Sequence, residues 1–134
     1  MVERFNHIGL CVNDADKTFE WMQKTMGASL VFRKVDNNLH QITLMAVLPD
    51  GISRFELMQP LSEDSAPGIF LKKRGGEGIH HISLFTHDVE GSTAAFEAEG
   101  CKVISRQKGL VFLHPKTTGG VLYELSDGTY GKDD

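Results

Sequence analysis

The sequence contains few residues of the kinds that mark special structural classes. Among its 134 residues are two cysteines, four prolines and one tryptophan. Cys11 and Cys101 show no spacing typical of a metal or redox motif, which excludes a disulfide-based scaffold. We expect two buried, reduced thiols, which fits a cytoplasmic protein.

Long apolar runs and a strong charge of either sign are also missing. No apolar segment approaches the roughly 18 residues that a membrane span needs, and the N-terminus lacks the basic and apolar regions of a secretory signal. We therefore expect no membrane partner. Eighteen acidic and 14 basic residues give a net charge of −4, which argues against nucleic acid as the main partner.

What the sequence does contain is an internal repeat. The segment 5–14 is echoed by the segment 79–88, and each copy is an apolar stretch that carries a histidine, His7 or His81, and ends in aspartate. A repeat of this kind indicates two similar supersecondary units in one chain. At 134 residues, the chain is long enough for one domain with a core built from two small modules.

Hydrophobic periodicity predicts the same order of elements in both halves. Strands are expected at 5–12, 29–35, 40–48 and 54–59 around a helix at 16–26, and at 79–86, 102–106, 109–113 and 120–126 around a helix at 90–99. The connector is expected to contain one short helical stretch, at 69–71. We therefore predict an α+β fold in which two fused βαβββ modules, at about 4–60 and 78–127, form a cupped mixed sheet within a single domain, 1–134.

Four polar residues interrupt the otherwise apolar strands: His7, Glu56, His81 and Glu124. Burying such groups without partners is costly, so their recurrence in both halves needs an explanation. Two imidazoles and two carboxylates are a suitable ligand set for one divalent metal ion. The alternative is a pair of core histidines that form hydrogen bonds with the carboxylates.

Longer motifs carry a resemblance to a known family. They are Asn6–Gly9, Phe55–Leu61, Gly78–Ile82, Phe112–Lys116 and Gly119–Leu125. With them the chain resembles the vicinal oxygen chelate superfamily (glyoxalase, bleomycin resistance protein and dioxygenase), and within it the methylmalonyl-CoA epimerases. The resemblance covers nearly the whole chain.

The resemblance implies a function and the residues that perform it. His7, His81 and Glu124 match the family's metal ligands, Glu124 also lies beside the substrate's α-carbon, and Glu56 matches a position near the metal. The implied cofactor is a divalent ion (cobalt, manganese, nickel, zinc or iron). The implied reaction is that of an isomerase or lyase, most specifically epimerisation of methylmalonyl-CoA or a related acyl-CoA thioester, in which the ion stabilises an enolate.

Two segments depart from the epimerase pattern. Some family members place an opposing glutamate base on the third strand of the first half, but Leu39–Leu44 contains no acid. His40 and Gln41 are therefore candidates for a catalytic role there, and a shift of one residue in register would exchange them. The segment Val103–Leu110 turns back earlier than in epimerases, which indicates that the substrate could differ.

Basic residues could bind an anionic ligand of the coenzyme A type. Lys116 follows a predicted strand and could reach a phosphate or carboxylate of the substrate, and the segment Lys72–Arg74 could meet the CoA phosphates. The alternative for both is a solvated surface.

Other functions on this scaffold stay open. They are a lactoylglutathione lyase of the glyoxalase I type, a metal-free binding or resistance protein, and an iron(II) dioxygenase. No glutathione motif is evident, the ligand set argues against a metal-free binder, and Glu56 argues against a dioxygenase. As partners we expect a small-molecule substrate and, as in many such proteins, a second copy in a homodimer.

Overall fold

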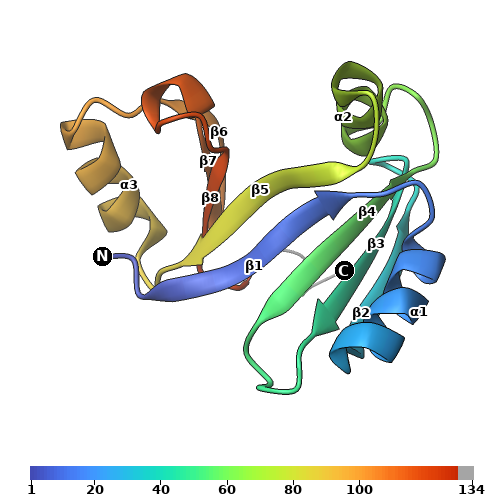
Figure 1. Cartoon of the computed structure of the whole chain (residues 1–134). Helices are drawn as coiled ribbons and strands as arrows, with labels where there is room; N and C mark the ends of the chain where they lie inside the picture. The colour runs from blue at the N-terminus through green and yellow to red at the C-terminus, as the bar shows by residue number, and fades with distance from the viewer. Residues whose placement is uncertain (130–134) are drawn as a thin grey trace. The chain divides into compact units, whose positions relative to one another are not determined.

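The computed structural model describes residues 1–129, and the chain contains two modules with the same βαβββ order (Figure 1). The first module consists of β1 (Arg4–Cys11), α1 (Ala15–Met26), β2 (Ser29–Asp36), β3 (Gln41–Val47) and β4 (Arg54–Pro60). The second consists of β5 (Gly78–Phe85), α3 (Val89–Ala98), β6 (Val103–Gln107), β7 (Leu110–Leu113) and β8 (Tyr123–Ser126). The predicted α+β class and both βαβββ modules are confirmed.

Strand pairing follows the same pattern in each module. The first strand runs parallel to the last, β1 beside β4 and β5 beside β8, and the remaining strands are antiparallel. The hydrogen-bonded order is β1-β4-β3-β2 in one module and β5-β8-β7-β6 in the other. His7 and His81 occupy equivalent positions, 74 residues apart, in the two first strands.

The chain divides into two compact units, and each is described by itself. One contains residues 8–80, and the other contains residues 1–7 together with the chain from His81 onward. The division passes through β1 and β5, so each of these strands contributes to both units. Both histidines of the repeat fall in the second of these units. The single domain predicted for 1–134 stays a prediction.

In the 8–80 unit, α1 covers one face of the strands (Figure 1). Its core contains Met22 of α1 and apolar residues from the strands, including Leu44, Ala46 and Leu57. Because side chains alternate along a strand, Gln41, Thr43 and Met45 of β3 lie on the opposite face. Glu56 pairs with Met45 in the β3–β4 register and shares that face.

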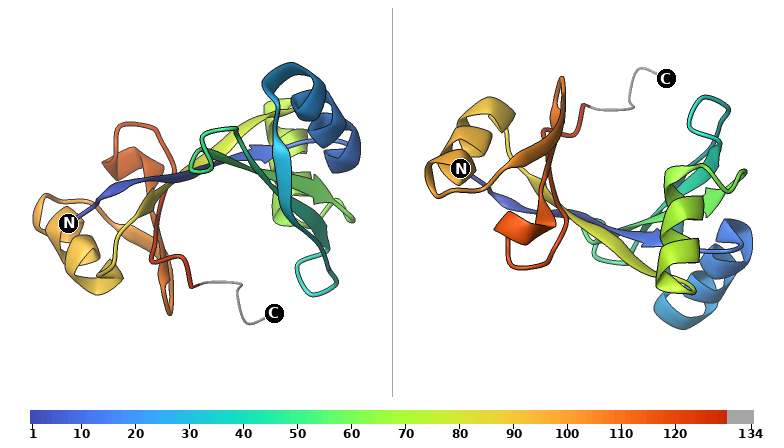
Figure 2. Two further views of the ribbon diagram at one scale, coloured as in Figure 1. Left: turned by 90° about the horizontal axis from the view of Figure 1, so that it is seen from below. Right: turned by 90° about the horizontal axis from the view of Figure 1, so that it is seen from above.

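In the unit of residues 1–7 and 81 onward, α3 covers the corresponding face. Val89 of α3 packs with Val111, Leu113 and Leu125. The N-terminus lies beside α3 in both views of Figure 2, and Val2 packs against this cluster. The other face of these strands is left for His81, Ser83, Phe112 and Glu124.

The connector differs from the sequence prediction. Where a short helical stretch at 69–71 was expected, a full helix, α2 (Ala66–Arg74), forms. Pro67 is compatible with the first turn of a helix, and the Ser65 side chain caps it by accepting a hydrogen bond from the Gly68 amide. A β-carbon at Gly68 would lie 2.4 Å from the carbonyl oxygen of Ser62, so this glycine permits close packing and does not break the helix.

None of the helices described between residues 1 and 129 is long and apolar enough to cross a membrane.

Candidate metal centre

Three of the four predicted ligands converge at one buried point. His7 comes from β1, His81 from β5 and Glu124 from β8, and all three belong to the same compact unit. The two Nε2 atoms are 3.0 Å apart. Glu124 Oε1 lies 3.6 Å from His7 Nε2, and Oε2 lies 3.7 Å from His81 Nε2. All three residues are buried.

Strand register explains the convergence of His81 and Glu124. In the parallel pair of β5 and β8, Ser83 lies opposite Glu124. His81 precedes Ser83 by two residues and therefore points to the same face. Phe112 of β7 pairs with Glu124, and its ring contacts His81 edge-on at a centroid distance of 5.6 Å. An aromatic ring and a carboxylate thus flank the His81 imidazole.

The geometry fits a divalent cation. Metal–ligand bonds of about 2.1 Å at angles of about 90° to 109° place neighbouring donor atoms about 3.0 to 3.4 Å apart. The separations of 3.0, 3.6 and 3.7 Å lie close to this range. Two imidazole nitrogens and one carboxylate are a common ligand set for first-row divalent metals. These residues therefore fit a metal ion, as the resemblance implied.

Burial dominates the electrostatics of Glu124. Removal from water raises the pKa of its carboxyl group to about 7, because a low-dielectric environment disfavours the charged form. The Ser83 hydroxyl donates a 2.6 Å hydrogen bond to Oε1, which acts in the opposite direction and lowers the pKa. A bound dication would also favour the carboxylate.

Glu56 is the counterpart of Glu124 in the first module. It lies opposite Gly9, two residues after His7, in the parallel pair of β1 and β4, just as Glu124 lies opposite Ser83. The register therefore confirms the repeated pattern of histidine and glutamate. Glu56 belongs to the 8–80 unit, and its role as a fourth ligand stays a prediction.

The structure distinguishes between the two catalytic candidates near the start of β3. His40 lies in an exposed turn before the strand and has a left-handed backbone, with φ of 53°. Gln41 is the first residue of β3, is buried and donates a 2.9 Å hydrogen bond from Nε2 to Thr43 Oγ1. Gln41, and not His40, shares the face of Glu56. A carboxamide does not ionise near neutral pH, so Gln41 can orient a ligand by hydrogen bonding but cannot act as a general acid or base.

The two basic candidates lie in short helical segments. Lys116 is exposed in a 3₁₀ turn, Pro115–Thr117, directly after β7. Its amide donates to His114 Nδ1 at 3.1 Å, which fixes the turn and leaves the ammonium group in solvent. The segment Lys72–Arg74 forms the last turn of α2.

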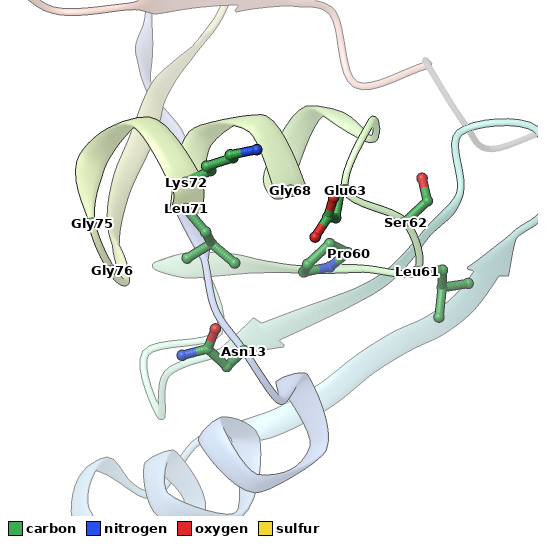
Figure 3. Close-up of a pocket in the computed structure, with 10 residues that line it drawn as sticks. All are labelled: Asn13, Pro60, Leu61, Ser62, Glu63, Gly68, Leu71, Lys72, Gly75 and Gly76. Atoms are coloured by element: carbon green, nitrogen blue, oxygen red, sulfur yellow. The ribbon is translucent and has the colours of Figure 1, made fainter.

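A pocket of about 670 Å³ opens beside α2 (Figure 3). Leu71 extends from the helix toward Pro60 at the end of β4, and Asn13 lies below them. The pocket is lined by residues 13, 60–63, 68, 71, 72, 75 and 76, all of which belong to the 8–80 unit. Of the basic candidates, Lys72 contributes to its wall.

Two neighbours of the metal ligands were not singled out from the sequence. They are Ser83 and Phe112. Ser83 carried a usable signal, because a residue two positions after a strand ligand shares its face. Phe112 could be found only through the β7–β8 register. Of the two buried thiols predicted, Cys11 is confirmed: its side chain has no exposed area, and burial together with the Glu56 charge raises its pKa to about 12. The prediction was wrong for Cys101, which is only partly buried.

Comparison with known proteins identifies the family. The family model described as the Glyoxalase/Bleomycin resistance protein/Dioxygenase superfamily matches residues 6–113. The chain belongs to this superfamily. Among curated proteins, the chain is 31% identical to the ethylmalonyl-CoA/methylmalonyl-CoA epimerase of Cereibacter sphaeroides, over 93% of this chain and 98% of the relative. It is also 31% identical to the human mitochondrial methylmalonyl-CoA epimerase, over 91% of this chain and 72% of the relative.

Solved structures of this superfamily share the fold. The methylmalonyl-CoA epimerase of Mycobacterium tuberculosis matches with a TM-score of 0.82 and 29% identity, over 93% of this chain and 87% of that one. A variant of the Streptomyces coelicolor methylmalonyl-CoA epimerase, in complex with 2-nitronate-propionyl-CoA, matches with a TM-score of 0.79 and 34% identity, over 93% and 96% of the two chains. The predicted resemblance to the epimerase-like branch of the superfamily is confirmed.

Proposed function

We propose that this protein is a metal-dependent acyl-CoA epimerase, with methylmalonyl-CoA as the leading substrate. The observation that carries the proposal is the buried convergence of His7, His81 and Glu124. It occurs in a chain similar to methylmalonyl-CoA epimerases over most of its length. Abstraction of a proton beside a carbonyl group requires a base and a positive charge close together, and a carboxylate beside a bound cation supplies both.

His7 and His81 hold the cation together with Glu124 in this proposal. The ion, of which cobalt, manganese, nickel, zinc and iron are the candidates, supplies Lewis-acid stabilisation of negative charge on the thioester oxygen. Phe112 packs against the His81 ring and keeps its plane fixed. We assign removal of the α-proton to the Glu124 carboxylate, in keeping with the position that the resemblance implies.

Epimerisation also requires a group that returns the proton on the opposite face. The face of β3 that Glu56 shares presents Gln41, Thr43 and Met45, none of which is an acid. Glu56 is the carboxylate on that face, and we propose it as a fourth metal ligand, as the sequence predicts. Gln41 serves as a hydrogen-bond donor and not as a base.

Lys116 is proposed to bind an anionic group of the acyl-CoA. Its exposed ammonium group suits a phosphate or carboxylate that arrives from solvent, and its turn follows directly from the strand that carries Phe112. The homodimer and the cytoplasmic location expected from the sequence stay predictions.

Solvent exchange at the substrate's α-carbon tests the proposal. Cobalt-loaded protein is incubated with methylmalonyl-CoA in heavy water, and NMR follows loss of the α-proton while chiral analysis follows interconversion of the epimers. We expect exchange with interconversion in the wild type and at least a hundredfold loss in Glu124→Gln, which keeps the size of the side chain but removes the carboxylate that serves both as base and as metal ligand. Lys116→Ala should raise KM and leave kcat largely unchanged.

The same experiment separates the alternatives. Exchange without interconversion would contradict epimerisation and indicate enolisation from one face only. Cobalt binding without any exchange would point to another substrate, and conversion of the glutathione–methylglyoxal adduct would then test for a lactoylglutathione lyase. A protein that binds no metal would support the metal-free binding alternative.

A further inference from the structure

Ser83 contacts Glu124, one of the proposed metal ligands, and takes no part in the proposed proton transfer. It lies on β5 two residues after His81 and opposite Glu124 in the parallel β5–β8 pair. Its side chain has no exposed area. Its hydroxyl donates to Glu124 Oε1 at 2.6 Å, within the short range typical of a hydroxyl that donates to a carboxylate.

The contact restricts the orientation of a side chain that would otherwise rotate. The terminal torsion of glutamate has a broad energy profile, so the plane of a free carboxylate is poorly defined. With Ser83 holding Oε1, that oxygen lies 3.6 Å from His7 Nε2 and Oε2 lies 3.7 Å from His81 Nε2. Each oxygen thereby faces one of the two imidazoles.

The first module has a glycine in place of this serine. There Gly9 occupies the position opposite Glu56 that Ser83 occupies opposite Glu124, and glycine has no hydroxyl to donate. The two halves therefore share the histidine and the glutamate but differ in the residue that faces the carboxylate. The βαβββ unit therefore forms without a serine at this position, so the hydrogen bond from Ser83 to Glu124 is not a requirement of the fold.

We propose that Ser83 is a positioning residue that holds the Glu124 carboxylate in the orientation in which it binds a divalent cation beside His7 and His81. Outer partners of metal ligands act in this way, and their loss typically lowers metal affinity roughly 10- to 100-fold. The inference rests on the proposed metal centre, but it does not depend on which substrate the protein transforms.

Ser92 offers a matched control. It is also buried, at 1% exposure, and its hydroxyl lies 2.7 Å from Thr86 Oγ1. It belongs to α3, which packs on the Leu125 face of the strands and not on the Glu124 face. Ser92→Ala therefore removes a buried hydroxyl with a hydrogen bond of its own while leaving the ligands untouched.

The test measures cobalt(II) affinity by calorimetry and the visible absorption spectrum of the cobalt-loaded protein for Ser83→Ala, Ser83→Thr and Ser92→Ala. We expect Ser83→Ala to weaken binding roughly 10- to 100-fold and to change the spectrum, because the ligand field depends on the carboxylate. Ser83→Thr keeps the hydroxyl and should restore most of the affinity and the spectrum. Ser92→Ala should change neither.

Two results would overturn the inference. The first is a Ser83→Ala variant with the affinity and spectrum of the wild type. The second is a loss of affinity in Ser92→Ala as large as that in Ser83→Ala, which would indicate a general effect of destabilisation. In either case the wild type still binds cobalt, so the proposed metal centre survives. If the wild type binds no cobalt, the metal centre and the role of Ser83 fall together. An absence of exchange at the substrate, with cobalt bound, would count against the proposed reaction alone.

Discussion

At the scale of single residues, the site depends on a carboxylate that is costly to bury. The Glu124 side chain is more than nine-tenths withdrawn from water, and Ser83 compensates for only part of the hydration that it loses. Such groups are typically retained for function and not for stability, because burying an apolar side chain of similar size in the same place would cost less free energy. The same burial at Cys11 raises a thiol pKa to about 12 and makes that residue inert.

The raised pKa of Glu124 predicts how pH affects stability without metal. Its folded pKa of about 7 lies above the ordinary value, so the folded state binds this proton more tightly than the unfolded state does. Its stabilising contribution is complete below about pH 4.5 and is lost as pH rises through 7, by up to about 3 kcal/mol. With metal removed by a chelator, the free energy of unfolding of Glu124→Gln should therefore increase relative to that of the wild type as the pH rises from 5 to 8.

Urea denaturation of both proteins across this pH range measures the difference between their free energies of unfolding. The amide introduced by Glu124→Gln stays neutral throughout, and the histidines are present in both proteins, so the pH dependence of this difference reports on Glu124. A difference in the free energy of unfolding that stays constant with pH would contradict the predicted role of burial. Added cobalt should reverse the trend in the wild type, since metal binding requires the deprotonated carboxylate.

At the scale of elements, the repeat extends to the signals that begin the helices. Asp14 caps α1 by accepting a hydrogen bond from the Lys17 amide at 3.1 Å, and Asp88 caps α3 by accepting one from the Gly91 amide at 2.9 Å. Asp16, in the first turn of α1, does not cap the helix but forms a salt bridge with Arg33.

We expect Asp14→Ala and Asp88→Ala each to lower the free energy of unfolding by about 1 kcal/mol, the usual effect of losing a helix cap. Asp16→Ala is the matched control: it removes a nearby aspartate that forms only an exposed ion pair, and its effect should stay below about 0.5 kcal/mol. Chemical denaturation of the three variants provides the values. An Asp16→Ala loss as large as that of Asp14→Ala would contradict this assignment.

The sequence predicts some helices and strands more accurately than others. The β1 and β5 strands and both capped helices follow from alternation, cap residues and the repeat, and their boundaries were predicted to within a residue or two. The α2 helix (Ala66–Arg74) is longer than the stretch predicted at 69–71. Its formation depends on a cap at Ser65 and on close packing against Ser62, and local periodicity reports neither.

At the scale of the whole molecule, a repeated strand order brings residues distant in the sequence to one point. His7, His81 and Glu124 could be chosen from the sequence because each is a polar exception in an apolar strand. Whether His40 or Gln41 faces the site depended on where β3 begins, which composition alone does not define. Alternation places Ser83 on the same face as His81, but its contact with Glu124 follows only from the β5–β8 register.

Binding of one divalent ion at His7, His81 and Glu124 is the step on which the proposed chemistry depends. Cobalt(II) titration with metal analysis examines this binding without reference to any substrate. We predict one high-affinity equivalent per chain in the wild type and its loss in His7→Ala, His81→Ala and Glu124→Ala. His80→Ala is the control, because His80 is the adjacent histidine on the opposite face of β5 and contacts Phe70; it should keep the bound equivalent. Retention of cobalt by the ligand variants, or its loss in His80→Ala alone, would contradict a metal centre at these three residues.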